Sequence, residues 1–501
     1  MPAVSSWPYK RIVAVAFVVS VFMDVLDVTI VNVALKTIGD KFGASATGLE
    51  WVVTGYLLSL AVWIPASGWV GDRIGTKRVF LFALGMFTMG SALCGLSWNI
   101  GALIAFRVVQ GIGGGMLVPV GTAMLYRAYP PSERARASAV LSIPSVLGPA
   151  LGPVLGGVIT THTSWRFIFL INVPIGVAAF VFGLLYLKES TEPTVGSFDY
   201  KGFALSATGF GLVIFGLSEV PRRGWSSPVA VIPTMVGLVV VAALIVYELR
   251  QSAPMLAFRL YTNRAFRSAN FVGFVGMGAF IGSIFILPLF LQNYRGLSPQ
   301  ESGLTTFTQA LGFIAVSRFV GLAYMRLGPR RLMVAGLALS AVINLNFLWV
   351  DGHTNLWWIR LIMFGRGLCL PMLFIPLQAS AFATISLPDT GRASSLFSTQ
   401  RQLASAVGVA ILGAILFTGL RVKTAAAVAA GATSEGVQRA QLDAYHRAFL
   451  WVVIFYAVGA VAALFVRDAD AAATMGPRSS APRSRGSDEE AGRAHEARTP
   501  T

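Results

Sequence analysis

Charged residues are scarce in this sequence, and their scarcity excludes most classes of protein. Only 12% of the 501 residues are Asp, Glu, Lys or Arg, whereas a soluble globular protein carries about 25%. Cysteine is scarcer still, and both cysteines, Cys94 and Cys369, lie in apolar stretches. Two distant cysteines form neither a disulfide framework nor the ligand spacing of a metal site. We therefore expect a membrane protein without a metal.

The sequence also lacks the residue clusters of an enzyme or an ATP-driven pump. Its four histidines are scattered, at His162, His353, His446 and His495. It has no G-x-x-x-x-G-K-[ST] run, the phosphate-binding loop of nucleotide-driven proteins. The sequence therefore predicts neither an enzyme nor a need for a cofactor, which leaves an ion gradient as the energy source.

Long charge-free runs take up most of the chain. A helix needs about 20 apolar residues to cross the hydrocarbon layer of a bilayer. A shorter run at 202–218 and two runs interrupted by charge, 12–35 and 302–325, bring the predicted spans to 14. The runs are continuous rather than alternating, which argues against a β-barrel. The uninterrupted runs of 19 or more residues are 51–71, 79–106, 108–126, 137–165, 167–187, 224–247, 268–294, 332–350, 367–388, 402–420 and 448–466.

The net charge of +17 is distributed unevenly among the predicted loops. With the N-terminus inside the cell, the inner loops hold 18 Lys and Arg and the outer loops hold 11. This bias has the sign of the positive-inside rule. The basic charge therefore indicates orientation, with both termini cytoplasmic, and does not indicate a nucleic-acid partner.

Three motifs recur in the second half of the chain in the same order. Residues 136–159 align without gaps to 392–415, the run 68–78 returns at 321–331, and Arg107 matches Arg366. Parallel repeats of this kind are typical of transporter folds. We predict an all-α polytopic membrane protein with two six-helix bundles, at 1–190 and 266–468.

Two further segments have no counterpart in the repeat. Residues 191–265 are predicted as a linker with two inserted spans, which we expect at the periphery. Residues 469–501 are rich in Ala, Arg, Pro, Ser, Gly and Glu, a composition that predicts a disordered cytoplasmic tail. Residues 419–447 are predicted as an outer loop.

The loop after the second span has a specific pattern, G-x-x-x-D-R-x-G-x-K-R. It resembles the signature loop of the major facilitator superfamily, which joins spans 2 and 3 on the cytoplasmic side. Glycine permits a tight turn, and Asp72 at a helix end can pair with a cation or a helix N-terminus of the opposing bundle. The resemblance implies a gate that closes the inner side, formed by Gly68, Asp72, Arg73, Gly75, Lys77 and Arg78. The alternative is that the basic residues only set topology.

The fifth span carries a glycine–proline run, Gly148, Pro149, Gly152, Pro153, Gly156 and Gly157. Glycines four residues apart lie along one helix face and allow a neighbouring backbone to approach closely. The run resembles the antiporter motif of exporters in the same superfamily. Export is therefore implied by the resemblance, while the spacing by itself predicts tight packing.

The first span contains Asp24 and Asp27, the only acidic residues deep within a predicted span. A charge at the bilayer centre costs about 2.5–3.5 kcal/mol, and burial favours the neutral form of a carboxyl group. The run L-D-x-T-I-V-N-V-A-L at 26–35 resembles the first-span motif of the 14-span drug:proton antiporters, the quaternary-ammonium and multidrug exporter group. That resemblance implies that Asp27 is the proton and cation site. Asp24 lies outside the motif, and a structural polar pair facing a water-filled cavity is the alternative.

Arg107 in the fourth span resembles an arginine of the same family that influences proton exchange. A purely structural hydrogen-bonding role is the alternative, because an arginine within a span needs a polar partner in either case. Arg318, Arg366 and Arg401 lie in spans of the second half, and no motif assigns them a role.

Together these features predict a proton-coupled antiporter of the bacterial cytoplasmic (inner) membrane. It would export hydrophobic or cationic drugs and other toxic small molecules by alternating access. Its expected partners are an amphipathic substrate, protons and membrane lipids, and the need for a periplasmic adaptor stays open. The alternatives are a dedicated exporter of an endogenous metabolite, antibiotic or lipid, or an uptake symporter.

Overall fold

A computed structural model describes residues 6–192 and 196–475. The first bundle contains six spans; its fifth is one continuous helix with three internal prolines, and its sixth is assembled from two helices. Polar side chains cap the N-termini of some of these helices. The Ser45 side chain accepts a hydrogen bond from the backbone nitrogen of Gly48, and the Asn99 side chain accepts one from that of Ala102. The helices are α1 (Tyr9–Phe42), α2 (Ala46–Ile74), α3 (Thr76–Gly95), α4 (Ile100–Ala128), α5 (Arg134–His162), α6 (Phe167–Leu170) and α7 (Asn172–Tyr186), with the short helix η2 (Pro131–Glu133) before α5.

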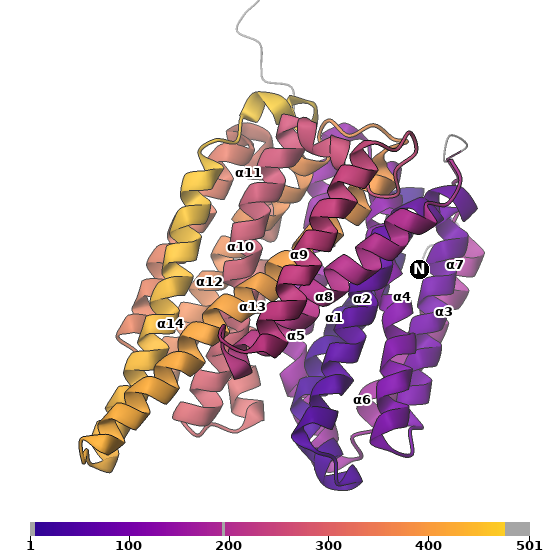
Figure 1. Ribbon diagram of the computed structural model, residues 1–501. Coiled ribbons are helices and arrows are strands. Elements are labelled where there is room, and N and C mark those ends of the chain that lie inside the picture. The colour runs from indigo at the N-terminus through magenta and orange to yellow at the C-terminus, as the bar shows by residue number, and fades with distance from the viewer. Residues whose placement is uncertain (1–5, 193–195, 476–501) are drawn as a thin grey trace, which may run out of the picture.

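The second bundle follows two inserted helices (Figure 1). The inserted helices are α8 (Tyr200–Arg223) and α9 (Pro228–Leu249), and the short helix η3 (Phe258–Thr262) leads into the second bundle. The second bundle consists of α10 (Arg264–Leu289), η4 (Phe290–Tyr294), α11 (Pro299–Leu345), η5 (Asn346–Leu348), α12 (Leu356–Ala381), α13 (Thr390–Ala429), α14 (Ser434–Ala463) and η6 (Asp468–Thr474).

Within the described residues, 13 helices are long and apolar enough to cross a membrane, and α11 supplies two passes. The 47 residues of α11 contain one non-helical position, Gly328, whose φ is +78°. Glycine adopts this conformation without strain, and the chain there turns from one pass into the next. The 14 predicted spans and the all-α fold are confirmed.

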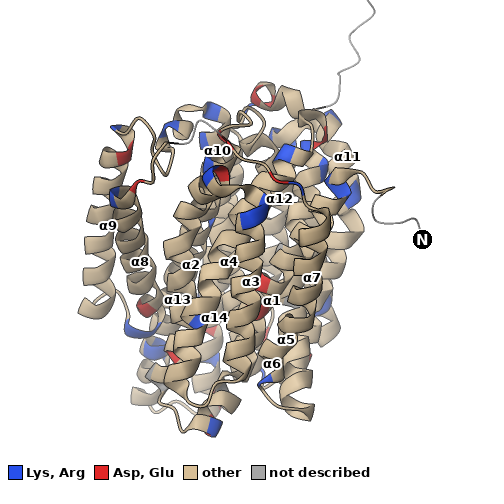
Figure 2. Ribbon diagram, turned by 90° about the vertical axis from the view of Figure 1, so that its right-hand side faces the viewer, with Lys and Arg blue, Asp and Glu red and all other residues tan. Residues whose placement is uncertain are grey.

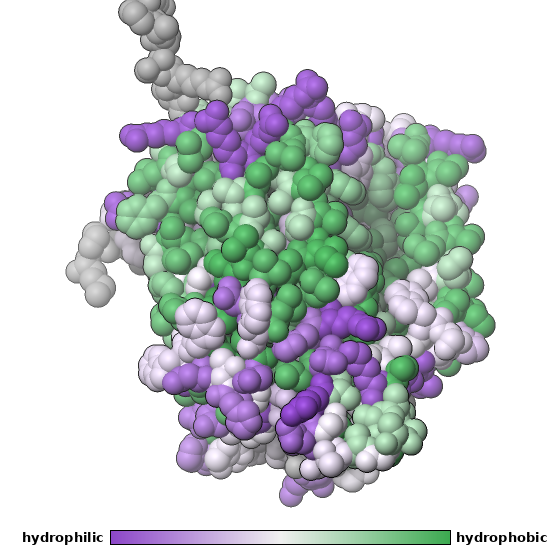
Figure 3. Space-filling model, turned by 90° about the vertical axis from the view of Figure 1, so that its left-hand side faces the viewer, coloured by the Kyte–Doolittle hydropathy of each residue, from purple (hydrophilic) through white to green (hydrophobic). Residues whose placement is uncertain are grey.

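On the face shown in Figure 3, an apolar band lies between two polar ends. Lys, Arg, Asp and Glu gather at the two ends of the helices, and few lie at mid-height (Figure 2). Large apolar side chains such as Leu185, Val239 and Phe271 are more than half exposed. Such an apolar surface is stable against lipid tails and unfavourable in water. The protein is therefore a multi-pass membrane protein.

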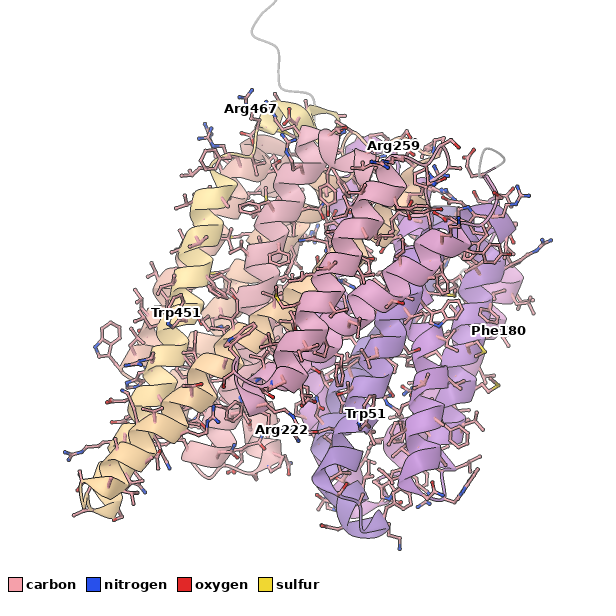
Figure 4. All side chains as sticks on the ribbon, in the orientation of Figure 1. Trp51, Phe180, Arg222, Arg259, Trp451 and Arg467 are labelled. Atoms are coloured by element: carbon pink, nitrogen blue, oxygen red, sulfur yellow. The ribbon has the colours of Figure 1, made fainter. Side chains whose placement is uncertain are left out.

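Of the two inserted helices, α9 lies at the periphery as predicted and contacts mainly α8, whereas α8 bridges the two bundles. On one side, Phe215 of α8 stacks on Trp51 of α2 at 5.9 Å, and Arg222 forms an ion pair with Glu50. On the other side, α8 residues such as Val220 share an apolar cluster with α13. Trp51 and Arg222 lie near each other in Figure 4. We call the boundary between the bundles, where α2 meets α13 and α5 meets α11 and α12, the seam.

The end of the molecule at which α1 begins is called here the N-terminal face, and the opposite end the far face. The predicted outer loop at 419–447 is mostly helical, because α13 and α14 extend beyond the rest of the far face (Figure 1). The predicted disordered tail also differs at its start, since Asp468–Thr474 form η6 on the N-terminal face with Thr474 buried. Residues 476–501 of that tail lie outside the described part of the chain.

Candidate coupling site and gate

Asp27 is completely buried inside the first bundle, at the meeting point of α1, α4 and α7. Its carboxylate forms an ion pair with Arg107 of α4. Gln110 donates a second hydrogen bond at 3.0 Å, and Asn172 at the start of α7 donates a third at 3.3 Å. The carboxylate therefore has three nitrogen donors from two other helices, which compensates the loss of water around a buried charge.

Arg107 is held in place by the backbone and by an aromatic ring. Its Nε donates to the carbonyl oxygen of Val52 at 3.2 Å, and its guanidinium lies 4.1 Å from the ring centroid of Tyr56. The glycines that follow bring α4 close to its neighbours: a Cβ on Gly113 would lie 2.4 Å from the backbone of α3. The glycines therefore let α4 pack closely against α3, while Arg107 extends to Asp27 of α1.

Asp24 lies one turn before Asp27 and has a different neighbourhood. The Tyr56 hydroxyl donates a hydrogen bond to its carboxylate, and the side chain is 7% exposed. Its charged neighbour across the seam is Arg401 of α13, which interacts with it electrostatically. The two aspartates of α1 thus have separate surroundings: Asp27 is enclosed within its bundle, and Asp24 faces the charge of the other bundle.

The glycines of α5 pack against α1 beside these aspartates. A Cβ on Gly148 would lie 2.5 Å from Val25, and one on Gly152 would lie 2.1 Å from the Thr29 hydroxyl. A Cβ on Gly156 would also touch α1, at 3.0 Å from Ile30, whereas Gly157 points toward α11. Pro149 and Pro153 lie within the same helix, and Pro153 packs on Gly303 of α11. The glycine–proline run therefore sits between α1 and the second bundle.

At the N-terminal face, Asp72 joins the two bundles. Its carboxylate forms an ion pair with Arg127 of α4 at 2.7 Å. A Cβ on Gly391, in the first turn of α13, would lie 2.3 Å from the same carboxylate, and one on Gly68 would lie 2.4 Å from the Gly391 carbonyl oxygen. Asp72 is therefore next to both a cation and the positive end of an opposing helix.

Other contacts close the seam at the same face. The Ser395 hydroxyl of α13 lies 2.6 Å and 2.8 Å from the carbonyl oxygens of Ile64 and Pro65 in α2. Arg134 of α5 donates a hydrogen bond to the carbonyl oxygen of Phe382, whose ring stacks on Tyr126 at 4.3 Å. The structure is therefore closed at the N-terminal face.

The remaining residues of the signature loop lie around a tight turn. Gly75 has a φ of +115°, a conformation that favours glycine. The Lys77 ammonium donates to the carbonyl oxygen of Leu184 at 2.7 Å, and Arg78 lies 3.7 Å from the Glu189 carboxylate. Arg73 is exposed. Lys77 and Arg78 thus order the turn, and Gly68 and Asp72 of the loop reach the second bundle.

The second bundle contains a counterpart to the Asp27 site. Arg366 of α12 is 3% exposed and donates a hydrogen bond to the Ser283 hydroxyl of α10. Ser283 follows Asp27 by 256 residues, the offset that also separates 136–159 from 392–415. The fourth-span arginine thus contacts the first span in both bundles, but only the first bundle supplies a carboxylate.

Sequence reasoning singled out Asp27, Arg107 and Asp72, but it missed several of their partners. Tyr56 and Asn172 carry contacts described above, and each is a polar residue within a long apolar stretch, whereas Arg401 was noted in the sequence without a role. That polarity was the available signal. No group of three or more His, Cys, Asp or Glu among residues 6–192 and 196–475 is placed to hold a metal ion.

Comparison with known sequences agrees with the loop pattern and the repeat. The sequence profile of the Major Facilitator Superfamily matches residues 17–284 and again 269–497, once for each half. The chain belongs to the Major Facilitator Superfamily. It is therefore a transporter and not an enzyme.

Curated relatives cover most of the chain. A Mycobacterium tuberculosis protein named "Multidrug resistance protein B homolog" is 36% identical over 397 residues, which are 78% of this chain and 73% of the relative. "Putative multidrug resistance protein MdtD" of Serratia proteamaculans is 34% identical over 403 residues, 79% of this chain and 83% of the relative.

Solved structures share the fold. The human organic anion transporter MFSD10 (TETRAN) aligns with a TM-score of 0.62 at 16% identity, covering 91% of this chain and all of that chain. A bacterial homologue of the human lysosomal transporter Spinster, inward-facing and unoccupied, aligns with a TM-score of 0.54 at 15% identity, covering 94% of this chain and all of that chain. At this identity the likeness concerns the fold.

Proposed function

We propose that this transporter is a proton-coupled antiporter that exports hydrophobic or cationic small molecules, drugs among them, across the bacterial cytoplasmic membrane. The observation that carries the proposal is the buried Asp27–Arg107 ion pair inside a membrane-crossing bundle. An ionisable pair in this setting is costly to bury, and such residues are typical of proton pathways. The two relatives named for multidrug resistance support the substrate class.

The N-terminal face is the cytoplasmic side in this proposal. The excess of Lys and Arg in the loops at this face supports the orientation. Because Asp72, Ser395 and Arg134 close the seam there, the structure corresponds to a state that is shut toward the cytoplasm. Alternating access then requires these contacts to open when the substrate enters from inside.

Proton binding at Asp27 changes the charge balance of the site. A proton from the outside neutralises the carboxylate and leaves Arg107 without its counter-ion, so the local potential becomes positive and a cationic substrate is repelled. Loss of the proton to the cytoplasm restores the ion pair, so that the negative charge of Asp24 nearby can attract a cation again. One proton crossing a potential of 100 mV supplies about 2.3 kcal/mol, and a pH gradient adds to this.

Asp24 and Arg401 offer a charged surface for the substrate at the seam. Asp24 can attract a cationic group, and the ring of Tyr56 beside it supplies an aromatic face. Arg401 of the opposite bundle competes for the same carboxylate, so a bound cation would displace it. This competition links substrate binding to the contact between the bundles.

The test is efflux of a fluorescent lipophilic cation in inverted membrane vesicles that carry the protein. We expect accumulation of the dye inside the vesicles when a proton gradient is imposed, and its loss when a protonophore is added. Accumulation that is insensitive to the protonophore would contradict proton coupling. Movement in the opposite direction would indicate an uptake symporter, and a dedicated exporter would leave the dye behind while an endogenous compound moves.

A further inference from the structure

The last described residues fold against the N-terminal face. The Thr474 hydroxyl at the end of η6 is fully buried and lies 2.6 Å from the Tyr324 hydroxyl. Asp470 accepts two hydrogen bonds, each of 2.9 Å, from Arg264 at the start of α10. Two separate contacts therefore tie this segment to the second bundle.

Asp468 holds the turn between the two passes of α11. Its Oδ1 accepts a hydrogen bond from the backbone nitrogen of Arg330 at 2.9 Å. A Cβ on Gly328 would lie 2.5 Å from the same oxygen, and the positive φ of Gly328 also favours glycine. The carboxylate caps the start of the second pass, where backbone N–H groups lack helical partners.

The first bundle uses the same arrangement with Glu189. Its carboxylate accepts hydrogen bonds from the backbone nitrogens of Lys77 at 3.0 Å and Arg78 at 3.2 Å. A Cβ on Gly75 would lie 2.4 Å from that carboxylate. In both bundles, therefore, an acidic residue just after the last span caps the loop between the second and third spans.

The segment after Asp468 reaches the other bundle. Helix η6 contacts η2, which precedes α5 in the first bundle. Met475 is 8% exposed and belongs to one apolar cluster with Ala135 of α5 and Tyr324 of α11. These contacts lie beside the hydrogen bond from Arg134 to Phe382, and they separate if the N-terminal face opens.

We propose that residues 467–475, which we call the C-terminal clasp, hold the N-terminal face closed. Met475 is the contact to the first bundle, and Asp468 is a positioning residue that fixes the clasp on the α11 turn. The inference rests on the proposed alternation between two states. A contact that exists in one of two states shifts the equilibrium toward that state, so weakening the clasp raises the population that is open toward the cytoplasm.

The test measures access to a cysteine placed behind the gate, in the full-length chain without substrate. Ser398→Cys places the reporter one helical turn beyond Ser395, at a position that is 4% exposed, and the native Cys94 and Cys369 are buried. A membrane-impermeant maleimide is added to inside-out vesicles. Losing about 1 kcal/mol of closing free energy changes the open population about fivefold, so Met475→Asp is expected to raise the labelling rate by about that factor.

Ala473→Asp is the matched control, because it adds the same charge to an exposed position of η6. It is expected to label at the rate of the reporter alone. Equal labelling of Met475→Asp and Ala473→Asp overturns the clasp. If Met475→Asp does not reach the membrane, Met475→Ala decides, and labelling at the parental rate then overturns the proposal.

Variants of Asp468 and Asp72 test the positioning of the clasp and the proposed alternation separately. Asp468→Ala is expected to increase the labelling rate of the reporter cysteine. Asp468→Asn is expected to label at the rate of the reporter alone, because the amide oxygen still accepts the hydrogen bond from Arg330. Equal labelling of the two variants overturns the positioning role of Asp468. Asp72→Asn tests the alternation itself. If it increases labelling and Met475→Asp does not, the clasp alone is wrong. If neither increases labelling, the proposed alternation is contradicted as well.

Discussion

The two bundles bury an arginine at matching positions, but they neutralise it differently. In the first bundle Arg107 is paired with the Asp27 carboxylate. In the second bundle Arg366 is held by the Ser283 hydroxyl and lies 3.6 Å from the Met363 sulfur. Among the described residues, no carboxylate forms an ion pair with Arg366.

In the first bundle the buried arginine is neutralised by a carboxylate, whereas in the second bundle its positive charge has no such partner among the described residues. The first bundle has a carboxylate, which we propose to bind the transported proton, whereas Ser283 offers Arg366 only a hydroxyl. The repeated helices therefore form the same framework twice, and the carboxylate is present in one copy. The consequence is that equivalent substitutions in the two bundles have unequal effects.

The largest difference is expected in transport. Asp27→Asn keeps the size of the side chain but removes its charge, so proton-driven dye efflux in vesicles should fall to the level of protein-free membranes. Ser283→Ala, at the matching position of the second bundle, should leave efflux near the parental rate. Comparable loss in both variants would show that the bundles do not differ in the way described.

The next largest difference is expected in stability. Arg107→Met leaves the Asp27 carboxylate buried without its partner, which costs about 3–5 kcal/mol. Arg366→Met leaves the hydroxyls of Ser283 and Tyr456 without the guanidinium, which costs about 1 kcal/mol for each lost hydrogen bond. Thermal unfolding of the two variants in the same detergent measures the difference, and equal losses would contradict the proposed inequality of the two sites.

Two glycines sharpen the comparison of packing. Gly152 and its counterpart Gly408 both face the first span of their bundle, where an added Cβ would lie 2.1 Å from the Thr29 hydroxyl or 2.2 Å from the Gly278 carbonyl oxygen. Overpacking costs about 1–3 kcal/mol. We expect Gly408→Ala to be the more destabilising of the two, because a backbone oxygen moves less readily than a side chain. Gly157→Ala, with 3.8 Å to its nearest neighbour, should be nearly neutral in the same unfolding measurement.

The smallest effect is expected from giving the second bundle a carboxylate. Ser283→Asp places an anion beside Arg366, and a hydrogen bond to a charged group adds about 1.5–3 kcal/mol at best. A rise in the unfolding temperature of the purified protein, with efflux unchanged, would agree with an arginine that lacks a counter-ion. A fall in that temperature would mean that Arg366 is already compensated.

The sequence was sufficient for the number of spans, the repeat and the family, because these depend on the order and length of apolar runs. It also pointed to Asp27 and Arg107 as candidates, since charge is rare in those runs, and to Asp72 through the loop pattern. The partners Tyr56 and Asn172 could not be assigned, because the helix faces that meet depend on packing between distant segments. The same limit explains why α8 was expected at the periphery.

The C-terminal segment shows a second kind of limit. Its composition is typical of disorder, yet Asp468 caps a turn and Met475 enters an apolar cluster. Single residues that dock onto a preformed surface leave no periodic pattern in the sequence. Composition therefore describes a segment as a whole and misses the few contacts that fix its start.

The central claim is that Asp27 exchanges the proton that drives export. The most direct measurement is substrate-induced proton flux in proteoliposomes with a trapped pH-sensitive dye, compared between the parent, Asp27→Asn and Ser283→Ala. The account predicts proton movement in the parent and in Ser283→Ala, and none in Asp27→Asn, even though that variant is inserted and folded. Proton movement at the parental rate in Asp27→Asn would contradict the account.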